Sequence, residues 1–440
     1  MKTGDNTNMC SHGFSFLTET ENVKKKENDM SESKFTTISG GVCAAKGFRA
    51  NGLNCGLNPN KEKNDLGLVV SDKLCDTAAV YTQNKVKGAP IYVTKEHLEK
   101  TNGTSMAVIV NSKNANTCNI DGIEKAKEMC RLTAETLGIQ TEQVVVASTG
   151  VIGQILPIEP IANHMKELAE RLSYDGNERA ATAIMTTDTI KKEYAVSFEL
   201  DGKTCVVGGM AKGSGMIHPN MATTLNFVTT DVNIAPSLLQ KALNEIVKVT
   251  YNCLSVDGDT STNDMLSIMA NGLAGNTRIE TEDKSYEVFK SALYQVLMNL
   301  TKMLAKDGEG ASKLLECSCN GAPDLDTAII VAKSVICSPL FKCAMFGEDA
   351  NWGRILCAIG YADAQFDIDK VDVKLTSCNG TIAVCKNGSG IEFSEEVAKE
   401  VLSADEIYIC VDLNQGGANA KAWGCDLTYD YVKINGDYRS

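Results

Sequence analysis

The chain has 440 residues, 43% of them hydrophobic and 22% charged, and a formal net charge of −13. This acidic balance argues against a nucleic-acid or anionic membrane partner, because phosphate-rich surfaces attract basic proteins. No apolar run approaches the roughly 18 residues that a membrane span requires, and the length leads us to expect two or more sub-domains.

Residues 1–36 are polar and carry charges of both signs. They lack the apolar core of a secretory signal, and their acidic residues are atypical of an organelle transit peptide. We interpret 1–36 as a disordered leader.

The first half of the chain alternates strand-like and helix-like segments. Short apolar runs bounded by turn residues predict buried strands at Leu66–Val70, Met106–Asn111 and Val144–Ala147. Apolar residues at helical spacing predict helices over Ile123–Leu137 and Ile158–Leu172. Further along, Asp201-Gly202 is a strong hairpin turn between two alternating runs, Tyr194–Leu200 and Thr204–Val207.

The second half continues the same mixture. Helical spacing recurs in Pro236–Tyr251 and Lys284–Leu304, and the last part is strand-rich at Val371–Cys385 and Glu406–Asp412. The sequence therefore predicts a mixed α/β fold in which helices cover sheets.

The chain contains 17 cysteines and four histidines. The cysteines are scattered, no CxxC pair occurs, and no HExxH pair is present, so no zinc signature appears. Many cysteines lie in apolar runs, for example Cys205, Cys357 and Cys410. We expect buried, reduced thiols in a cytoplasmic protein, and no metal site.

The most informative segment runs from Lys212 to Leu225, with the sequence KGSGMIHPNMATTL. A threonine hydroxyl becomes a good nucleophile when a base takes its proton, and the α-amino group of an N-terminal threonine can serve as that base. If Thr223 Oγ1 attacked the carbonyl of Ala222, the chain would cut itself and expose such an amine. Gly213 and Gly215 can adopt backbone angles closed to other residues, which would let the segment strain at this bond.

Two other interpretations of this segment stay open. It is also compatible with an ordinary glycine loop followed by a buried strand, Thr223–Val228. If the chain does cut itself, Thr224 is the alternative nucleophile, although the Ala222–Thr223 bond is preferred. His218, close by, is either a second base or a loop histidine.

Other polar loops carry groups suited to the same chemistry. Thr149 and Gly150 follow the strand Val144–Ala147 and could form an oxyanion hole, although a tight turn has the same pattern. Lys212 is either a fixed cation for a substrate carboxylate or a solvated lysine. Glu309, between two glycines at the end of a long helix, is either solvated or directed at a ligand.

The segment Asp257–Asp264 resembles a calcium loop, but residue 268 is Ile where an EF-hand needs a bidentate glutamate. We interpret it as a hydrogen-bonded cap and active-site wall.

Taken together, these segments resemble the ornithine acetyltransferase family, also called the glutamate N-acetyltransferases of arginine biosynthesis. The resemblance runs from about residue 37 to the C-terminus and rests on the order and spacing of motifs. These motifs are Gly41–Arg49, Asn111–Asn116, Ser148–Gly153, Ala183–Thr189, Lys212–Leu225, Asp257–Asp264, Asp307–Lys313, Gly347–Arg354 and Cys425–Thr428.

The resemblance implies a fold with two α/β sub-domains and self-cleavage between Ala222 and Thr223. Residues 37–222 would form an α chain and 223–440 a β chain that begins with the nucleophile Thr223. Thr149 and Gly150 would form the oxyanion hole. The substrate-binding residues would be Thr186, Lys212, Thr223, Glu309, Asn435 and Ser440.

The implied reaction moves an acetyl group from N2-acetylornithine to L-glutamate through an acetyl-threonine intermediate. It needs no cofactor, while acetyl-CoA stays open as a second donor. The expected partners are these small molecules and the two chains of one precursor, assembled as α2β2. Two alternatives have different outcomes: an N-terminal-nucleophile amidohydrolase or aminopeptidase would pass the acyl group to water, and a binding protein would stay uncleaved.

Overall fold

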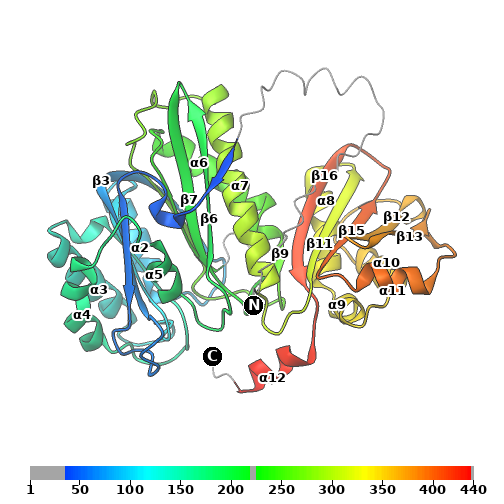
Figure 1. Cartoon of the computed structure of the whole chain (residues 1–440), viewed down its shortest axis with the longest axis horizontal. Helices are drawn as coiled ribbons and strands as arrows, with labels where there is room; N and C mark the ends of the chain where they lie inside the picture. Colours follow the sequence, from blue (N-terminus) through cyan, green and yellow to red (C-terminus); the bar gives the residue numbers. More distant parts are fainter. Residues whose placement is uncertain (1–34, 219–223, 438–440) are drawn as a thin grey trace, which may run out of the picture. The chain divides into compact units, whose positions relative to one another are not determined.

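The computed structural model describes residues 35–218 and 224–437, which belong to one compact unit, Phe35–Ser440. Two mixed sheets with helices packed against them form this unit (Figure 1). The predicted mixed α/β fold is therefore confirmed. The predicted leader, 1–36, lies almost entirely outside the described residues.

The first sheet has nine described strands in the order β1-β6-β7-β8-β10-β3-β4-β5, with β2 paired to β3. Most neighbours are antiparallel, but β8–β10 and β4–β5 are parallel. The strands are β1 (Thr36–Ile38), β2 (Phe48–Leu53), β3 (Leu66–Tyr81), β4 (Thr104–Asn111), β5 (Val144–Ser148), β6 (Lys192–Leu200), β7 (Lys203–Lys212), β8 (Leu225–Thr230) and β10 (Met265–Ala270).

The second sheet has seven described strands in the order β14-β13-β12-β15-β11-β16-β9. It is also mixed, because β11–β15 and β16–β9 are parallel. The strands are β9 (Leu254–Ser255), β11 (Leu314–Ala322), β12 (Asp372–Ser377), β13 (Gly380–Lys386), β14 (Ser389–Gly390), β15 (Glu406–Asp412) and β16 (Ala418–Cys425).

Helices cover both sheets. In the first sheet α2 and α3 pack against β5, α5 against β2 and α6 against β3, while α8 packs against β11 and β16 of the second. The described helices are α2 (Ala89–Lys100), α3 (Gly122–Leu137), α4 (Ile158–Glu170), α5 (Asn177–Ala183), α6 (Pro236–Val249), α7 (Lys284–Lys306), α8 (Leu325–Cys337), α9 (Pro339–Phe346), α10 (Trp352–Gly360), α11 (Glu395–Leu402) and α12 (Tyr429–Asp437).

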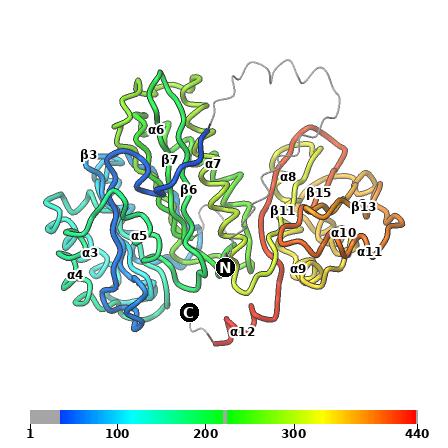
Figure 2. The backbone as a smooth tube through the Cα atoms, viewed as in Figure 1, coloured from blue at the N-terminus to red at the C-terminus, as the bar shows by residue number. Residues whose placement is uncertain are grey.

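Helix α7 joins the two sheets. It contacts β6 and β7 of the first sheet and β11 and β16 of the second, so its path can be followed between them in Figure 2. Its apolar residues Leu293, Leu297, Leu300 and Leu304 are fully buried in a core cluster that includes residues of both sheets. The helix begins where the Asp283 carboxylate accepts a hydrogen bond from Tyr286 N, a typical N-cap.

Local sequence signals explain several boundaries. The turn between β6 and β7 places Asp201 at φ 50° and Gly202 at φ 72°, the left-handed pair that an Asp-Gly hairpin favours. The strand predicted over Thr223–Val228 begins in the structure at Leu225. The strand predicted at Leu66–Val70 extends to Tyr81, because its second half, Asp76–Tyr81, pairs with β10.

The first sheet takes strands from both sides of the predicted cleavage bond. β7 precedes it and β8 follows it, and the two are antiparallel neighbours in which Lys212 pairs with Leu225. The division into chains 37–222 and 223–440, a prediction from the sequence, therefore does not coincide with the division into sheets.

Every described cysteine is a free thiol, and ten of the sixteen are buried. Cys205 is buried in β7, but Cys357 is exposed. The expectation of a buried thiol is wrong for Cys357, because it occupies the outer face of the amphipathic helix α10. Across residues 35–218 and 224–437 no single helix has the length and apolar composition to cross a membrane; the pair α8–α9, bent by 58°, meets those two criteria together.

The position of α7 leads to a first prediction. Leu300 is fully buried, and its Cδ1 atom packs so closely on β7 that a Cβ on Gly209 would lie 3.1 Å from it. Leu300→Ala should lower the free energy of unfolding by about 2–5 kcal/mol, measured by urea denaturation, because it leaves a cavity in the core. Ser291→Ala on the same helix removes only a bond to the helix's own Glu287 carbonyl and should change stability by less than about 0.5 kcal/mol. Equal effects would contradict this role of α7.

Candidate active site

The candidate site lies where the chain passes from β7 to β8. β7 ends at Lys212 and β8 begins at Leu225, so the segment between them connects two paired strands. Residues 219–223 of this connection, including Ala222 and Thr223, lie outside the described residues. The described residues on either side define the surroundings of the predicted cleavage bond.

The loop Asp257–Asp264 holds the connection at both ends. The Asp257 carboxylate accepts hydrogen bonds from Met216 N (2.6 Å) and Ile217 N (2.9 Å). On the far side, Asp264 Oδ1 accepts Thr224 N at 2.8 Å. Both carboxylates therefore accept hydrogen bonds from backbone amides, which agrees with the hydrogen-bonded cap expected of this loop.

A small pocket opens at this point. Thr149 and Lys212, both predicted to be site residues, line it together with Thr224, the neighbour of the predicted nucleophile. The other lining residues are Gly213, Gly215, Met216, Leu225, Ser261, Asn263 and Asp264.

The predicted oxyanion loop follows β5 and has a backbone that only glycine allows. Gly150 has φ 131°, and a Cβ there would lie 2.2 Å from the carbonyl carbon of Lys113. Thr149 N donates a hydrogen bond to Asn111 O. The Thr149 hydroxyl makes no hydrogen bond with another residue of 35–218 or 224–437 and remains a donor for a ligand oxygen. The backbone at Thr149 forms an isolated antiparallel bridge with Asn114.

Asn263 fixes the oxyanion loop against the cap. Its Nδ2 donates to Ala115 O (2.6 Å) and to Ser148 O (2.9 Å), the residue before Thr149. Its Oδ1 accepts from Thr117 Oγ1 at 2.5 Å. One buried amide thus joins the end of β5 to the start of β10.

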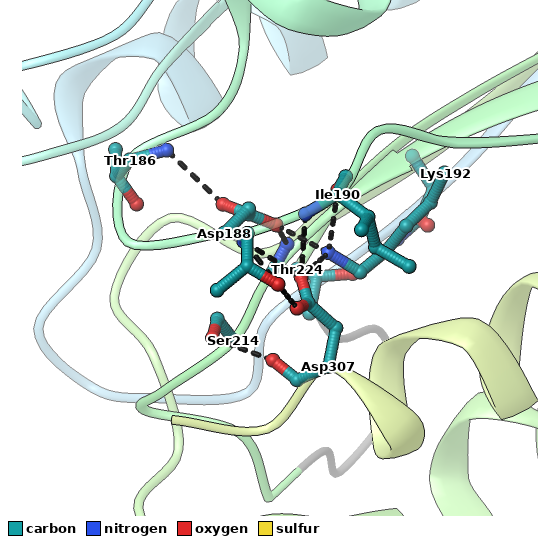
Figure 3. Close-up of polar contacts among 10 residues, drawn as sticks. Thr186, Asp188, Ile190, Lys192, Ser214, Thr224 and Asp307 are labelled. Atoms are coloured by element: carbon teal, nitrogen blue, oxygen red, sulfur yellow. Dashed lines mark hydrogen bonds and ion pairs between the residues drawn. The ribbon is translucent and has the colours of Figure 1, made fainter. Parts of the chain in front are cut away.

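Behind the pocket lies a buried ion cluster. Lys192 Nζ is 2.7 Å from Asp188 Oδ1 and 2.6 Å from Asp307 Oδ2, with side-chain exposures of 0%, 0% and 4% (Figure 3). Burial by itself raises the pKa of Asp188, but the charges of Lys192 and Lys212 outweigh it and hold the pKa below its usual value. Asp188 is therefore an anion at neutral pH.

This ion cluster organises three segments that the sequence placed in the site. Asp188 accepts from Thr186 N at 3.0 Å and from Gly213 N at 2.7 Å. Asp307 O accepts from Ser214 Oγ at 2.6 Å, as drawn in Figure 3. The predicted substrate-binding segments around Thr186, Lys212 and Glu309 are thereby tied together.

Lys212 is half-buried, and its side-chain ammonium makes no hydrogen bond or ion pair with another residue of 35–218 or 224–437. Its ammonium lies close enough to Asp188 and Asp264 to act on both through space. A cation held in this way can receive a ligand carboxylate.

Glu309 lies on the other side of the glycine loop. Its backbone N donates to Ser214 O at 2.9 Å, and its Oε2 accepts from Asn435 Nδ2 at 2.8 Å. The structure thus brings together two predicted substrate residues, Glu309 and Asn435. The third residue of this group, Ser440, lies outside the described residues.

The glycines of the loop have different roles. Gly213 has φ 156°, but Gly215 does not have a positive φ, which corrects the expectation that its backbone angle requires glycine. Instead, a Cβ on Gly215 would lie 2.3 Å from Glu309 Oε2. Gly215 is needed because the carboxylate occupies that space.

Thr224 has the backbone conformation that is most unusual for its residue type. Its φ is 67°, an outlier for a β-branched side chain. Its Oγ1 accepts from Asn226 Nδ2 at 2.6 Å, and its carbonyl accepts from Met265 N at 3.0 Å. The residue that follows the predicted nucleophile is strained and firmly held.

His218 is a packing histidine. Its Nδ1 lies 3.1 Å from Ser255 Oγ and 3.6 Å from Cys337 Sγ, and it does not line the pocket. Burial lowers the pKa of His218 to about 4. Of the two interpretations of His218, this geometry favours the loop histidine.

Sequence reasoning missed Lys192 and did not single out Asp188, Asp307 or Asp264. The three aspartates lie inside motifs used for the resemblance, so their motif membership was an available signal. Lys192 begins an ordinary alternating strand, and nothing local marks it as fully buried.

Comparison with known proteins identifies the family of this chain. The ArgJ family model matches residues 49–440, so the chain belongs to the ArgJ family, as the motifs led us to expect. The arginine biosynthesis bifunctional protein ArgJ 1 of Clostridium acetobutylicum is 50% identical over 394 residues, which cover 89% of this chain and 96% of that protein.

Two solved structures are also similar. The arginine biosynthesis bifunctional protein ArgJ of Bacillus halodurans is 46% identical over 48% of this chain and 98% of its own, with a TM-score of 0.46. Ornithine acetyltransferase of Mycobacterium tuberculosis, solved with ornithine, is 33% identical over 43% of this chain and 100% of its own, with a TM-score of 0.39.

The ion cluster leads to a second prediction. Lys192→Met leaves two buried carboxylates without their cation and should lower the free energy of unfolding by about 3–5 kcal/mol at pH 7. In the wild type the contribution of Asp188 is present above pH ~4 and is lost as the pH falls through its lowered pKa.

In Lys192→Met, burial would instead raise the pKa of Asp188, so stability is lost as the pH rises through that value. The difference from wild type in urea denaturation should therefore be smaller at pH 5 than at pH 7. A difference that does not depend on pH would contradict the ionic role of Lys192.

Proposed function

We propose that this ArgJ-family chain transfers an acetyl group from N2-acetylornithine to L-glutamate, with Thr223 as the nucleophile. The observation that carries the proposal is one pocket in which Thr149 and Lys212 lie beside Thr224. A hydroxyl donor and a cation thus adjoin the residue that follows the nucleophile. Membership of the ArgJ family supports the same chemistry.

The first step is self-cleavage. Thr223 Oγ1 attacks the carbonyl carbon of Ala222, the peptide C–N bond breaks, and the hydroxyl proton moves to the released nitrogen. Water then hydrolyses the resulting ester, leaving a carboxylate on Ala222 and a free α-amine on Thr223. That amine is the base that the transfer reaction needs, with an ordinary pKa of roughly 7.7–8.0.

The transfer proceeds in two halves. The Thr223 amine takes the hydroxyl proton, and Oγ1 attacks the acetyl carbonyl of N2-acetylornithine. The oxyanion is stabilised by Thr149 Oγ1–H and Gly150 N–H. As the C–N bond breaks, the proton passes to the leaving nitrogen and ornithine departs. The amine of glutamate then attacks the acetyl-threonine by the reverse route, giving N-acetylglutamate.

Recognition of the two amino acids follows from the charges in the site. Both carry an α-carboxylate, which the half-buried Lys212 ammonium can bind. Ornithine carries an additional cationic amine, which the Glu309 carboxylate can bind. Asn435 Nδ2 donates a hydrogen bond to Oε2 of the same carboxylate. Thr186 and Ser440 complete the proposed substrate set.

The proposal has further parts that follow from the family resemblance. The reaction needs no metal and no organic cofactor, and acetyl-CoA stays open as a second donor. The two chains, 37–222 and 223–440, would assemble as α2β2 in the cytoplasm. Use of water in place of glutamate would make the protein an amidohydrolase, so the assay must measure both acceptors.

The nucleophile leads to a third prediction. Wild-type protein should separate by intact-mass measurement into fragments ending at Ala222 and beginning at Thr223. Thr223→Ala should remain one chain near 47.2 kDa and lose transfer of acetyl from N2-acetylornithine to glutamate, because it lacks the attacking hydroxyl. A cut after residue 223 in that variant would move the nucleophile to Thr224, and an uncut wild type would contradict self-cleavage.

Lys212 leads to a fourth prediction. Lys212→Met should raise KM for both amino acids roughly tenfold to hundredfold, because it removes a charged hydrogen-bond donor worth about 1.5–3 kcal/mol. Lys203→Met, an exposed lysine at the opposite end of β7, is the matched control and should leave KM unchanged. Kinetics of Lys212→Met equal to those of the control would remove Lys212 from the site.

A further inference from the structure

Asp264 is a buried carboxylate in the pocket that has no part in the mechanism above. It immediately precedes β10 and is 3% exposed. Its Oδ1 accepts Thr224 N at 2.8 Å, and the Ser261 side chain also hydrogen-bonds to its carboxylate. On the neighbouring part of the pocket wall stands Lys212.

The hydrogen bond to Thr224 N matters because of the peptide group to which that nitrogen belongs. A peptide group is planar and contains the carbonyl of the preceding residue. The amide that Asp264 holds therefore belongs to the bond joining Thr223 to Thr224. Met265 N also donates a hydrogen bond to the Thr224 carbonyl. Both backbone polar groups of Thr224 are therefore held, which fixes the orientation of the chain at Thr224.

The proposed base, the Thr223 amine, belongs to the residue next to Thr224, whose nitrogen Asp264 holds. A nearby negative charge favours the protonated form of an amine, and the Lys212 cation opposes it.

We infer that Asp264 is a positioning residue for the proposed reaction, and this inference rests on that function. Its carboxylate holds the peptide group that follows the nucleophile, and its negative charge stabilises the ammonium that forms when the Thr223 amine takes the hydroxyl proton.

The charge of Asp264 is poised to change in the range where the reaction would run. Burial raises its pKa to about 7, while hydrogen bonds from Thr224 N and Ser261 and the charge of Lys212 limit the rise. Among the described residues, Lys212 on β7 is the charged group that acts on it. Because Asp264 and the amine would be coupled, their titrations appear as properties of the pair.

Asp264→Asn provides the main test. It retains an oxygen that can accept Thr224 N–H but cannot ionise, so self-cleavage should continue. Without the negative charge the amine is a weaker base, and the acidic limb of the kcat/KM profile should move to lower pH by about one unit. Asp264→Ala lacks the acceptor as well and should self-cleave at least tenfold more slowly than wild type, followed by intact mass.

Two further variants separate this role from a structural one. Ser261→Ala removes a hydrogen bond that lowers the pKa of Asp264, so the acidic limb should move in the same direction as in Asp264→Asn, but less. Asp231→Asn is the matched control: Asp231 is fully buried and accepts two backbone amides, from Lys46 and Val206, elsewhere in the first sheet. It should lower the melting temperature without moving the pH profile.

The outcomes are distinct. Wild type that neither cleaves nor transfers acetyl overturns the proposed function itself. Active wild type whose pH profile is unchanged in both Asp264→Asn and Ser261→Ala overturns only the role of Asp264. If Asp264→Asn does not fold, Ser261→Ala alone decides, since it leaves the carboxylate in place.

Discussion

The site depends on one buried cation. Lys192 is surrounded by protein, and a buried ammonium is stable only when opposite charges and hydrogen-bond acceptors replace its water. Asp188 and Asp307 supply them from positions 4 and 115 residues away. Each carboxylate then has oxygen capacity left over, which backbone amides occupy. Asp188 accepts hydrogen bonds from the backbone amides of Thr186 and Gly213, and Asp307 accepts one from Thr189. A single buried ion thereby fixes the segments that carry the proposed substrate-binding residues.

The same cluster explains why Lys212 remains able to bind a ligand. Asp188 lies near enough to Lys212 to feel its charge, yet its oxygens are taken by Lys192 and by two backbone amides. The Lys212 ammonium is therefore attracted toward the pocket wall without being hydrogen-bonded to a described residue there. Its hydrogen-bonding capacity remains for a carboxylate, which forms stronger, charge-assisted bonds than a neutral group does.

Much of this could be predicted from the sequence, and the limits are physical. Periodicity located α3, α4, α6 and α7 within a few residues, because each has one apolar face. Motif order brought Thr149, Lys212 and Glu309 to one region. The buried ion cluster could not be predicted because it depends on non-local contacts. No residue near Lys192 in the sequence indicates that it will be buried and paired with Asp188 and Asp307. Gly215 was assigned to the right loop for the wrong reason, since the approach of Glu309 depends on the tertiary fold. Ala222, Thr223 and Ser440 lie outside the described residues, so their roles stay predictions.

The strand pairing shows how such a site could tolerate a break in the chain. β7 and β8 pair with each other on the two sides of the segment, and β10 pairs with both β8 and β3. A cut between Ala222 and Thr223 falls in the connection and removes no ladder hydrogen bond. The conformation of Thr224 costs an intact chain on the order of 1–3 kcal/mol, and Asp264, Asn226 and Met265 hold it in place. The sheet thus keeps strain next to the bond at which the proposed cleavage would occur.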